Sequence, residues 1–274
     1  MDYLKLSLKE LSDGVKTGKF SSEELVRFFV KRIEEYKEYN AIIEVFDDAI
    51  EQAKAIDAKA KAGEKLGKLA GVPVVIKDNI LCKGKHMSCA SKFLKDFVSP
   101  YDATIITKLK NEGAVILARS NMDEFAMGGS CEKSVYGATL NAYDESCVAG
   151  GSSGGSAVAV ALGLCPMALG TDTGGSIRQP SSFNGVVGIK PTYGTVSRYG
   201  IVAFASSTDQ AGPITRTVED NEYALEILAG KDEKDQTSIK SDLGEKMLKQ
   251  TYKIGVCKEI IEKLKTLEQF PKYE

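Results

Sequence analysis

Residues 149–180 read "AGGSSGGSAVAVALGLCPMALGTDTGGSIRQP" and combine three Gly-Gly-Ser triplets with an uncharged apolar run. The triplets end at Ser152, Ser156 and Ser176. A glycine pair allows φ > 0 and close approach of other groups, so the serine behind it can lie on a tight turn near backbone N–H groups. The stretch is therefore typical either of a functional site or of a flexible loop.

Two local patterns within this stretch favour a site. Ser156 opens an apolar helical run, so the N–H groups and the positive dipole end of that helix point back toward the glycine turn. Ser176 follows a strand-like run, and the backbone N–H groups of Thr173, Gly174 and Gly175 form a nest beside it. Such a nest can hold an oxyanion that develops during acyl transfer.

A serine nucleophile needs a base that accepts its proton. The one histidine, His86, lies between lysines in the polar segment "KGKHMSC" and is expected at the surface. Lys77, in "GVPVVIKDNI", follows an apolar run, and burial would lower its pKa from about 10.4. The alternative is that Lys77 reaches solvent from a strand end or pairs with Asp78.

Two matches to short catalytic motifs carry less weight, and a third motif is absent. Residues 151–155, "GSSGG", match the nucleophile elbow G-x-S-x-G, but no suitable histidine follows them. Ser130 to Lys133 match S-x-x-K, yet the triplet "KTG" precedes that serine instead of following it. No G-x-x-x-x-G-K-[ST] segment is present, so nucleotide binding through a P-loop is unsupported.

Composition limits the class of protein. The 274 residues are 43% hydrophobic and 27% charged with a net charge of −2, which fits a soluble globular protein and disfavours a basic nucleic-acid-binding surface. Six cysteines without a C-x-x-C pair and one histidine indicate reduced thiols and no metal site. The N-terminus lacks the apolar core of a signal peptide, and the longest uncharged run, residues 157–170, is shorter than the ~20 residues of a membrane span. We expect a cytoplasmic protein without membrane contact.

The pattern along the chain predicts an α/β fold. Residues 1–68 indicate helices: Ser21 and Glu24 form a capping box, and a third helix follows within residues 47–64. From Gly71 onward, short apolar runs alternate with helical patterns, which predicts a mixed or mostly parallel central sheet with helices on both faces. The apolar runs are residues 71–76, 113–119, 165–170 and 185–190, and the helical ones are 101–113, 156–163 and 217–230.

We expect one domain over residues 1–274. It consists of N-terminal helices (1–68), a core (69–220), and a polar linker with a divergent end (221–274). Within that end, residues 252–259 are predicted as a strand and residues 260–269 as a helix.

From about Leu69 to Asp220 the chain resembles the amidase signature family. The segments "GVPVVIKDNI", "GGSSGGSA", "GTDTGGSIRQPSSFNGVVGIKPTYG" and "DQAGPITRTVED" occur in the family's order. The segments "NMDEFAMGGS", "YDATIITKLK" and "VSRYGIVAFASSTDQAGPITRTVED" are most similar to the branch that serves as the amidase component of aminoacyl-tRNA amidotransferases. The resemblance implies the amidase-signature fold.

The resemblance also implies residue roles. In the family a Ser-Ser-Lys triad replaces histidine, and matching motifs assign Ser176 as nucleophile, Ser152 as the serine with a cis peptide bond that relays the proton, and Lys77 as base. Ser153 would support the relay. The oxyanion hole would consist of the N–H groups of Thr173, Gly174 and Gly175. The substrate pocket would include Ala126, Met127 and Gly128.

The implied reaction is hydrolysis of glutamine through an acyl-enzyme. The released ammonia would pass to a partner, the B subunit, which binds misacylated Glu-tRNA(Gln) or Asp-tRNA(Asn) and uses ATP and magnesium. A third protein, the C subunit, would wrap around this chain. No cofactor or metal is expected in this chain, and tRNA contact is expected only through the B subunit.

Family members continue beyond residue 274, so the resemblance predicts a sheet that is incomplete at the C-terminus and negligible glutamine hydrolysis by these 274 residues alone. Two other readings stay open at this point. One is a stand-alone amidase acting on another small amide, and the other is an inactive chain that only binds partner subunits.

Overall fold

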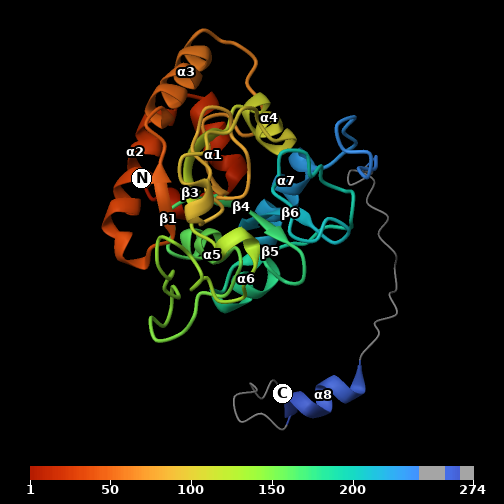
Figure 1. Ribbon diagram of the computed structural model, residues 1–274. Helices are drawn as coiled ribbons and strands as arrows, with labels where there is room; N and C mark the ends of the chain where they lie inside the picture. Colours follow the sequence, from red (N-terminus) through yellow and green to blue (C-terminus); the bar gives the residue numbers. More distant parts are fainter. Residues whose placement is uncertain (241–256, 266–274) are drawn as a thin grey trace. The chain divides into compact units, whose positions relative to one another are not determined.

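The chain is described by a computed structural model over residues 1–240 and 257–265. A six-stranded sheet with the order β1-β3-β2-β4-β6-β5 forms its centre (Figure 1). The strands are β1 (Ile42–Val45), β2 (Pro73–Lys77), β3 (Val115–Ser120), β4 (Met167–Asp172), β5 (Val187–Gly188) and β6 (Gln210–Thr215).

The sheet is mixed. Strand β2 pairs in parallel with β3 and with β4, whereas β1 with β3, β4 with β6, and β5 with β6 are antiparallel. The expectation of a mixed sheet is confirmed, and the alternative of a mostly parallel one is wrong. Because β2 and β4 are parallel, Lys77 at the end of β2 and Thr171 near the end of β4 emerge at the same edge of the sheet.

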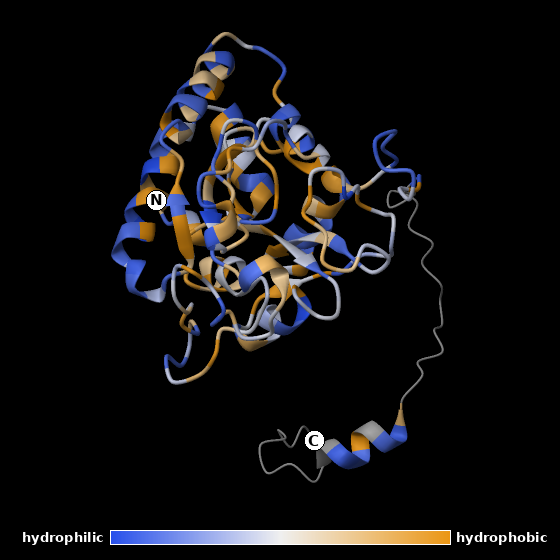
Figure 2. Cartoon of the chain, in the orientation of Figure 1, coloured by the Kyte–Doolittle hydropathy of each residue, from blue (hydrophilic) through white to orange (hydrophobic). Residues whose placement is uncertain are grey.

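Helices cover both faces of the sheet, as predicted. Figure 1 shows α4 and α7 on one side of the sheet and α5 and α6 on the other. Figure 2 shows hydrophobic residues gathered on the strands and on the inward sides of the helices. The helices of this part are α1 (Leu8–Lys16), α2 (Ser22–Glu35), α3 (Ala49–Lys61), α4 (Thr104–Asn111), α5 (Gly154–Ala161), α6 (Arg178–Phe183) and α7 (Val218–Leu228). Each helical pattern found in the sequence coincides with one of them.

The N-terminal caps differ in one detail from the prediction. Ser21 caps α2 by accepting a hydrogen bond from the Glu24 N–H, as expected. The Glu24 carboxylate does not complete the capping box, because it accepts a hydrogen bond from the Tyr3 hydroxyl instead. A complete capping box stands at the start of α1, between Ser7 and Glu10.

Strands β1 and β6 were not predicted from the sequence. β6 contains Gly212 and Pro213, which weaken any strand pattern. Strand β5 pairs with β6 only at Ile214 and Thr215, so the ladder on that side ends before Pro213, which has no N–H to donate. A proline is tolerated at such a position, and tertiary pairing with β4 makes the strand.

The chain divides into two units, Met1–Ser241 and Asp242–Glu274. In the second unit, helix α8 spans Lys258–Lys265. Residues 258 and 259 were predicted as a strand end but begin this helix, consistent with the helix propensity of Lys and Glu. Residues 252–256 of the predicted strand and 266–269 of the predicted helix lie outside the described residues. Within residues 1–240 and 257–265, no helix combines the length and apolarity that a membrane crossing requires.

We predict that Gly155→Ala destabilises the fold although alanine favours helices. A Cβ at this buried position in α5 would lie 2.5 Å from the carbonyl oxygens of Ala41 and Asn121. A clash with backbone atoms cannot be relieved by a change of side-chain rotamer, so the free energy of unfolding should fall by about 1–3 kcal/mol. Chemical denaturation measures this change. Gly129→Ala is the control, because its nearest neighbour would be Gln179 Nε2 at 3.7 Å, and an equal loss in both variants would contradict the steric explanation.

Candidate active site

The Lys77 amine is the centre of a buried polar cluster. Its side chain has no solvent exposure. The Nζ atom lies 2.7 Å from Ser152 Oγ, 2.8 Å from Ser153 Oγ and 2.9 Å from Thr171 Oγ1. These partners come from β4 and from the loop before α5, and the peptide bond between Gly151 and Ser152 is cis. The structure therefore brings Lys77, Ser152 and Ser153 together.

The two serines differ in where their protons point. Ser153 Oγ donates to the Thr171 carbonyl at 3.1 Å, so toward Lys77 it acts as an acceptor. Among the described residues the Ser152 hydroxyl has no other hydrogen-bond partner than the Lys77 amine. A neutral amine has one lone pair, so Ser152 is the serine that can donate its proton to Lys77.

Burial lowers the pKa of Lys77 from its usual 10.5 to about 7. Desolvation of the ammonium form is the largest cause, and it is opposed by Cys131, Asp123, Asp172 and Cys89. A substantial fraction of neutral amine therefore exists near pH 7, which suits a general base.

Ser176 lies on the loop that follows β4. Asp172, at the end of that strand, fixes the loop: its carboxylate accepts two hydrogen bonds from the Arg178 guanidinium and further ones from the N–H groups of Gly175, Ile177 and Arg178. Burial raises the pKa of Asp172, but these hydrogen bonds outweigh it and lower the pKa below its usual value. Asp172 was not predicted as a site residue, although an acidic residue at the end of an apolar strand is a usable signal.

Ser176 is joined to the Ser152 loop through the backbone. The Ser153 N–H donates to the Ser176 carbonyl at 3.0 Å. Within the part of the chain that the structure describes, no hydrogen bond joins the hydroxyls of Ser152 and Ser176. Catalytic hydrogen bonds are often long before a substrate binds.

One of the three amide groups expected to bind an oxyanion is engaged. The Gly175 N–H donates to Asp172 Oδ1 at 2.8 Å, because the tight turn after β4 directs it at that carboxylate. In the described residues the N–H groups of Thr173 and Gly174 have no such partner. Of the three expected groups, these two donors are the ones available to an anion in this structure.

A second carboxylate, Asp209, fixes Thr173 from the other side. Asp209 accepts hydrogen bonds from Thr173 Oγ1 at 2.5 Å and from the N–H groups of Phe204 and Ala205. The loop of residues 204–209 is also held by the Arg198 guanidinium, which donates a hydrogen bond to the Ser206 carbonyl. The turn that carries Thr173 is thus attached to residues 204–209.

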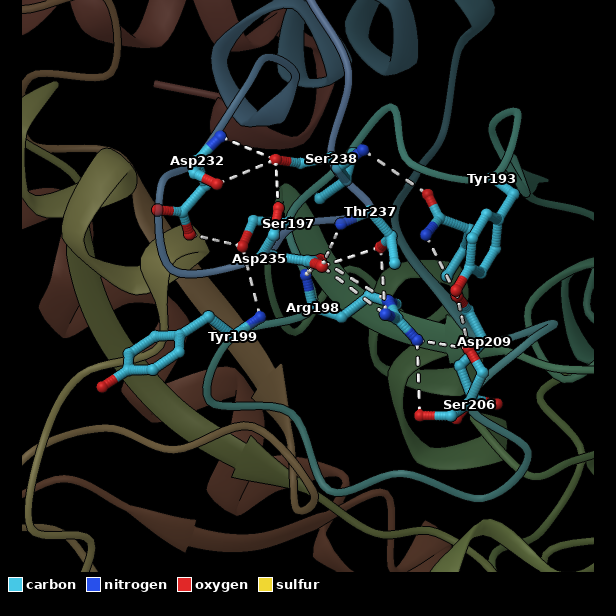
Figure 3. A network of polar contacts seen from close by, with 12 residues as sticks. Tyr193, Ser197, Arg198, Tyr199, Ser206, Asp209, Asp232, Asp235, Thr237 and Ser238 are labelled. Atoms are coloured by element: carbon cyan, nitrogen blue, oxygen red, sulfur yellow. Dashed lines mark hydrogen bonds and ion pairs between the residues drawn. The ribbon is translucent and has the colours of Figure 1, made fainter.

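The Arg198 network extends to the end of the first unit. Figure 3 shows Arg198 between Ser206 and Asp235, and its Nε lies 3.5 Å from the Asp235 carboxylate. Arg198 Nη2 also donates to Thr237 Oγ1 at 3.0 Å. Residues 235–237 therefore support the loop that borders the site.

Ser176 opens into a cavity of about 390 Å³. This volume fits a small ligand. The cavity is lined by Ala126, Gly128, Gly129, Gly151, Gly174, Gly175, Ser176, Gln179 and Phe204. Ala126 and Gly128 were expected here. Met127 was expected as well, but it is not among the lining residues and is 58% exposed, because the backbone turns left-handed at Phe125 and Ala126 just before it. Gln179 and Phe204 were missed, since nothing in the sequence links them to the glycine loops.

The structure decides between the alternatives that the sequence left open for His86, Lys77 and Ser156. His86 is exposed, as expected. Lys77 neither reaches solvent nor pairs with Asp78, whose carboxylate lies 3.5 Å from Arg119 and accepts from Ser88. Ser156 hydrogen-bonds the Ser120 hydroxyl and the Leu169 carbonyl inside the fold, so its triplet is structural.

Comparison with known proteins shows the family of this chain. The family model described as Amidase matches residues 24–268. The chain belongs to the amidase family. The A subunit of glutamyl-tRNA(Gln) amidotransferase from Natranaerobius thermophilus is 56% identical over 236 residues, which cover 85% of this chain and 48% of that protein. The homologous protein from Clostridium acetobutylicum is 48% identical over 269 residues, covering 95% of this chain and 56% of the relative.

Solved structures of the family share the fold. The crystal structure of the A subunit of glutamyl-tRNA(Gln) amidotransferase from Thermotoga maritima superimposes with a TM-score of 0.75 at 43% identity, covering 88% of this chain and 50% of that one. The peptide amidase of Stenotrophomonas maltophilia gives a TM-score of 0.82 at 36% identity, covering 86% and 50%. The chain spans about half the length of the relatives it matches.

We predict that Lys77 makes stability depend on pH. Because its folded pKa lies near 7 and its unfolded pKa near 10.5, the unfolded state binds more protons between these values, and stability gains with rising pH in that window. The free energy of unfolding of the parent minus that of Lys77→Met should rise by about 1 kcal/mol per pH unit there. Urea denaturation across this range measures it, with exposed Lys65→Met as control. A difference that does not change with pH would contradict a lowered pKa.

Proposed function

We propose that this chain carries the amidase site of an aminoacyl-tRNA amidotransferase, a site that hydrolyses glutamine through an acyl-enzyme on Ser176. The observation that carries the proposal is the fully buried Lys77 amine, which has a pKa lowered to about 7 and lies 2.7 Å from Ser152. Gly151, the residue before Ser152, lines the cavity that contains Ser176. A buried lysine with a lowered pKa is a suitable base where histidine is absent.

In the proposed acylation, Ser176 Oγ attacks the amide carbon and its proton passes to Ser152, while the Ser152 proton passes to neutral Lys77. The carbon–nitrogen bond then breaks, and ammonia leaves with the proton returned from Lys77 through Ser152. Water hydrolyses the ester by the same path and frees glutamate and Ser176. Ser153 and Thr171 support the relay by accepting hydrogen bonds from the Lys77 amine.

The negative charge of the tetrahedral intermediate is stabilised by the N–H groups of Thr173 and Gly174. Preorganised backbone donors of this kind are effective because they need no rearrangement during the reaction. Asp172 and Asp209 hold the turn that presents them. The Gly175 N–H donates to Asp172 and so contributes to the shape of that turn instead of contacting the intermediate.

Glutamine as the substrate and the amidotransferase context are supported by relatives named as the A subunit of glutamyl-tRNA(Gln) amidotransferase, at 48–56% identity. By that analogy the ammonia passes to the B subunit, where ATP and magnesium activate misacylated Glu-tRNA(Gln) or Asp-tRNA(Asn), and the C subunit binds this chain. The location we propose is the cytoplasm.

A second candidate is a stand-alone amidase for another small amide, such as a peptide amide. It is favoured by the TM-score of 0.82 with the peptide amidase of Stenotrophomonas maltophilia, against 0.75 with the amidotransferase structure from Thermotoga maritima. Ammonia release from glutamine, set against release from an amidated peptide, separates the two candidates.

We predict that a fluorophosphonate labels Ser176. The Ser176 oxygen forms a bond to phosphorus, fluoride leaves, and the serine proton passes through Ser152 to Lys77. Ser176→Ala should abolish labelling, and Ser152→Ala should slow it by about 10²- to 10⁴-fold, the usual worth of general acid–base catalysis. Mass spectrometry of intact protein measures both rates, and Ser156→Ala, a buried serine outside the site, should label like the parent. Labelling that survives Ser176→Ala would refute the nucleophile.

We also predict that the labelling rate of the parent rises through about pH 7 and then levels off, since neutral Lys77 is the base. In Lys77→Ala this inflection should vanish, leaving a slow rate that increases with hydroxide concentration. The same inflection in both proteins would assign the pKa to another group and make Lys77 structural.

A further inference from the structure

Gly151, the residue before Ser152, is held by the Gln179 side chain. Its N–H donates to Gln179 Oε1 at 2.9 Å. The other end of the same amide, Nε2, donates to the Gly129 carbonyl at 3.0 Å. One glutamine side chain thus bridges the two glycine loops that border the cavity, and both of its polar atoms are used.

Asp123 confines Gly151 from another side. A Cβ on Gly151 would lie 2.1 Å from Asp123 Oδ2, so the carboxylate packs directly against the glycine backbone. The carboxylate is itself fixed by the N–H groups of Cys131 at 3.0 Å and Lys133 at 3.2 Å. The Asp123 N–H also donates to the Ser152 carbonyl at 3.3 Å. Gly151 cannot shift toward Asp123, and the Gln179 hydrogen bond limits movement away from it.

Gln179 is also fixed relative to Ser176. It lies in α6, three residues after Ser176, and its N–H donates to the Gly175 carbonyl at 2.8 Å. Since no hydrogen bond joins the hydroxyls of Ser152 and Ser176 among the described residues, other contacts between their two segments must set their spacing. Three hydrogen bonds join the Ser152 loop to the segment that contains Ser176 and α6: the Ser153 N–H to the Ser176 carbonyl, the Asn184 side chain to the Ala149 carbonyl, and the Gly151 N–H to Gln179. Of these, the Gln179 bond is the one to the peptide unit directly before Ser152.

We propose that Gln179 is a positioning residue of the acylation step, which sets the spacing of Ser152 and Ser176 by holding the Gly151 peptide unit to the segment that carries the nucleophile. The inference rests on the proposed function. A primary amide is needed because the position requires one acceptor for Gly151 and one donor for Gly129 at the same end of the side chain.

The test compares two glutamines with similar local roles. Gln52 is also half-buried, accepts from the Ile116 N–H and donates to the Ile116 carbonyl, but lies in α3 outside the cavity. Fluorophosphonate labelling of the parent, Gln179→Met and Gln52→Met is followed over a range of probe concentrations. This yields a maximal rate constant and a half-saturating concentration for each protein.

Gln179→Met should lower the maximal rate constant by up to about 10²-fold, the cost of a misplacement of about 1 Å, while the half-saturating concentration stays near that of the parent. Gln52→Met should change neither. Hydrogen–deuterium exchange of the Gly151 amide gives a readout without chemistry: it should become faster in Gln179→Met and remain unchanged in Gln52→Met.

Each contrary result has a distinct meaning. A parent that is not labelled contradicts the proposed function itself. Labelling of Gln179→Met at the parent's maximal rate overturns the positioning role and leaves the proposed function intact. A change confined to the half-saturating concentration also overturns it, because Gln179 would then contact the ligand. Unchanged exchange at Gly151 refutes the hydrogen bond on which the inference depends.

Discussion

The burial of one amine among three hydroxyls is the interaction on which the rest of the site depends. An ammonium ion without solvent is costly, so Lys77 carries a pKa near 7 and is held by short hydrogen bonds to Ser152, Ser153 and Thr171. These residues belong to β2, to β4 and to the loop before α5. The cluster therefore forms only if β2 pairs in parallel with β4 and the loop before α5 lies against both strand ends.

The glycines of the opening stretch are explained by contact distances. Gly151 leaves room for the Asp123 carboxylate, and Gly155 leaves room for the backbone at Ala41 and Asn121. Side chains at these two positions would displace the loop or the helix that starts behind it. The glycine pairs thus allow α5 to approach the sheet closely enough for Ser152 to reach Lys77. Asp172 extends this order to the loop that carries Ser176, because it accepts hydrogen bonds from backbone N–H groups of that loop. Asp209 accepts a hydrogen bond from the Thr173 hydroxyl and so attaches the turn after β4 to the N–H groups of Phe204 and Ala205.

The sequence by itself determined the class of the fold and the main elements of the site. Because burial acts on each segment separately, apolar runs and helical periodicity located β2, β3, β4 and the helices α4, α5 and α7, but not α6. The apolar run before Lys77 indicated burial, but only the structure excluded that the amine reaches solvent or pairs with Asp78. The family motifs then pointed to Ser152 and Ser176, whose catalytic roles stay a proposal.

The tertiary structure alone decided what depends on partners distant in the chain. Strand β6, with Gly212 and Pro213, exists because β4 pairs with it, and the antiparallel pairings followed no local signal. Three features of the site also had no signal in the sequence: the hydrogen bond from the Gly175 N–H to Asp172, the exposure of Met127, and the hydrogen bond from Gly151 to Gln179. A hydrogen bond requires that its donor and acceptor lie close together in the right orientation. A linear sequence does not show which distant residues the fold brings together in this way.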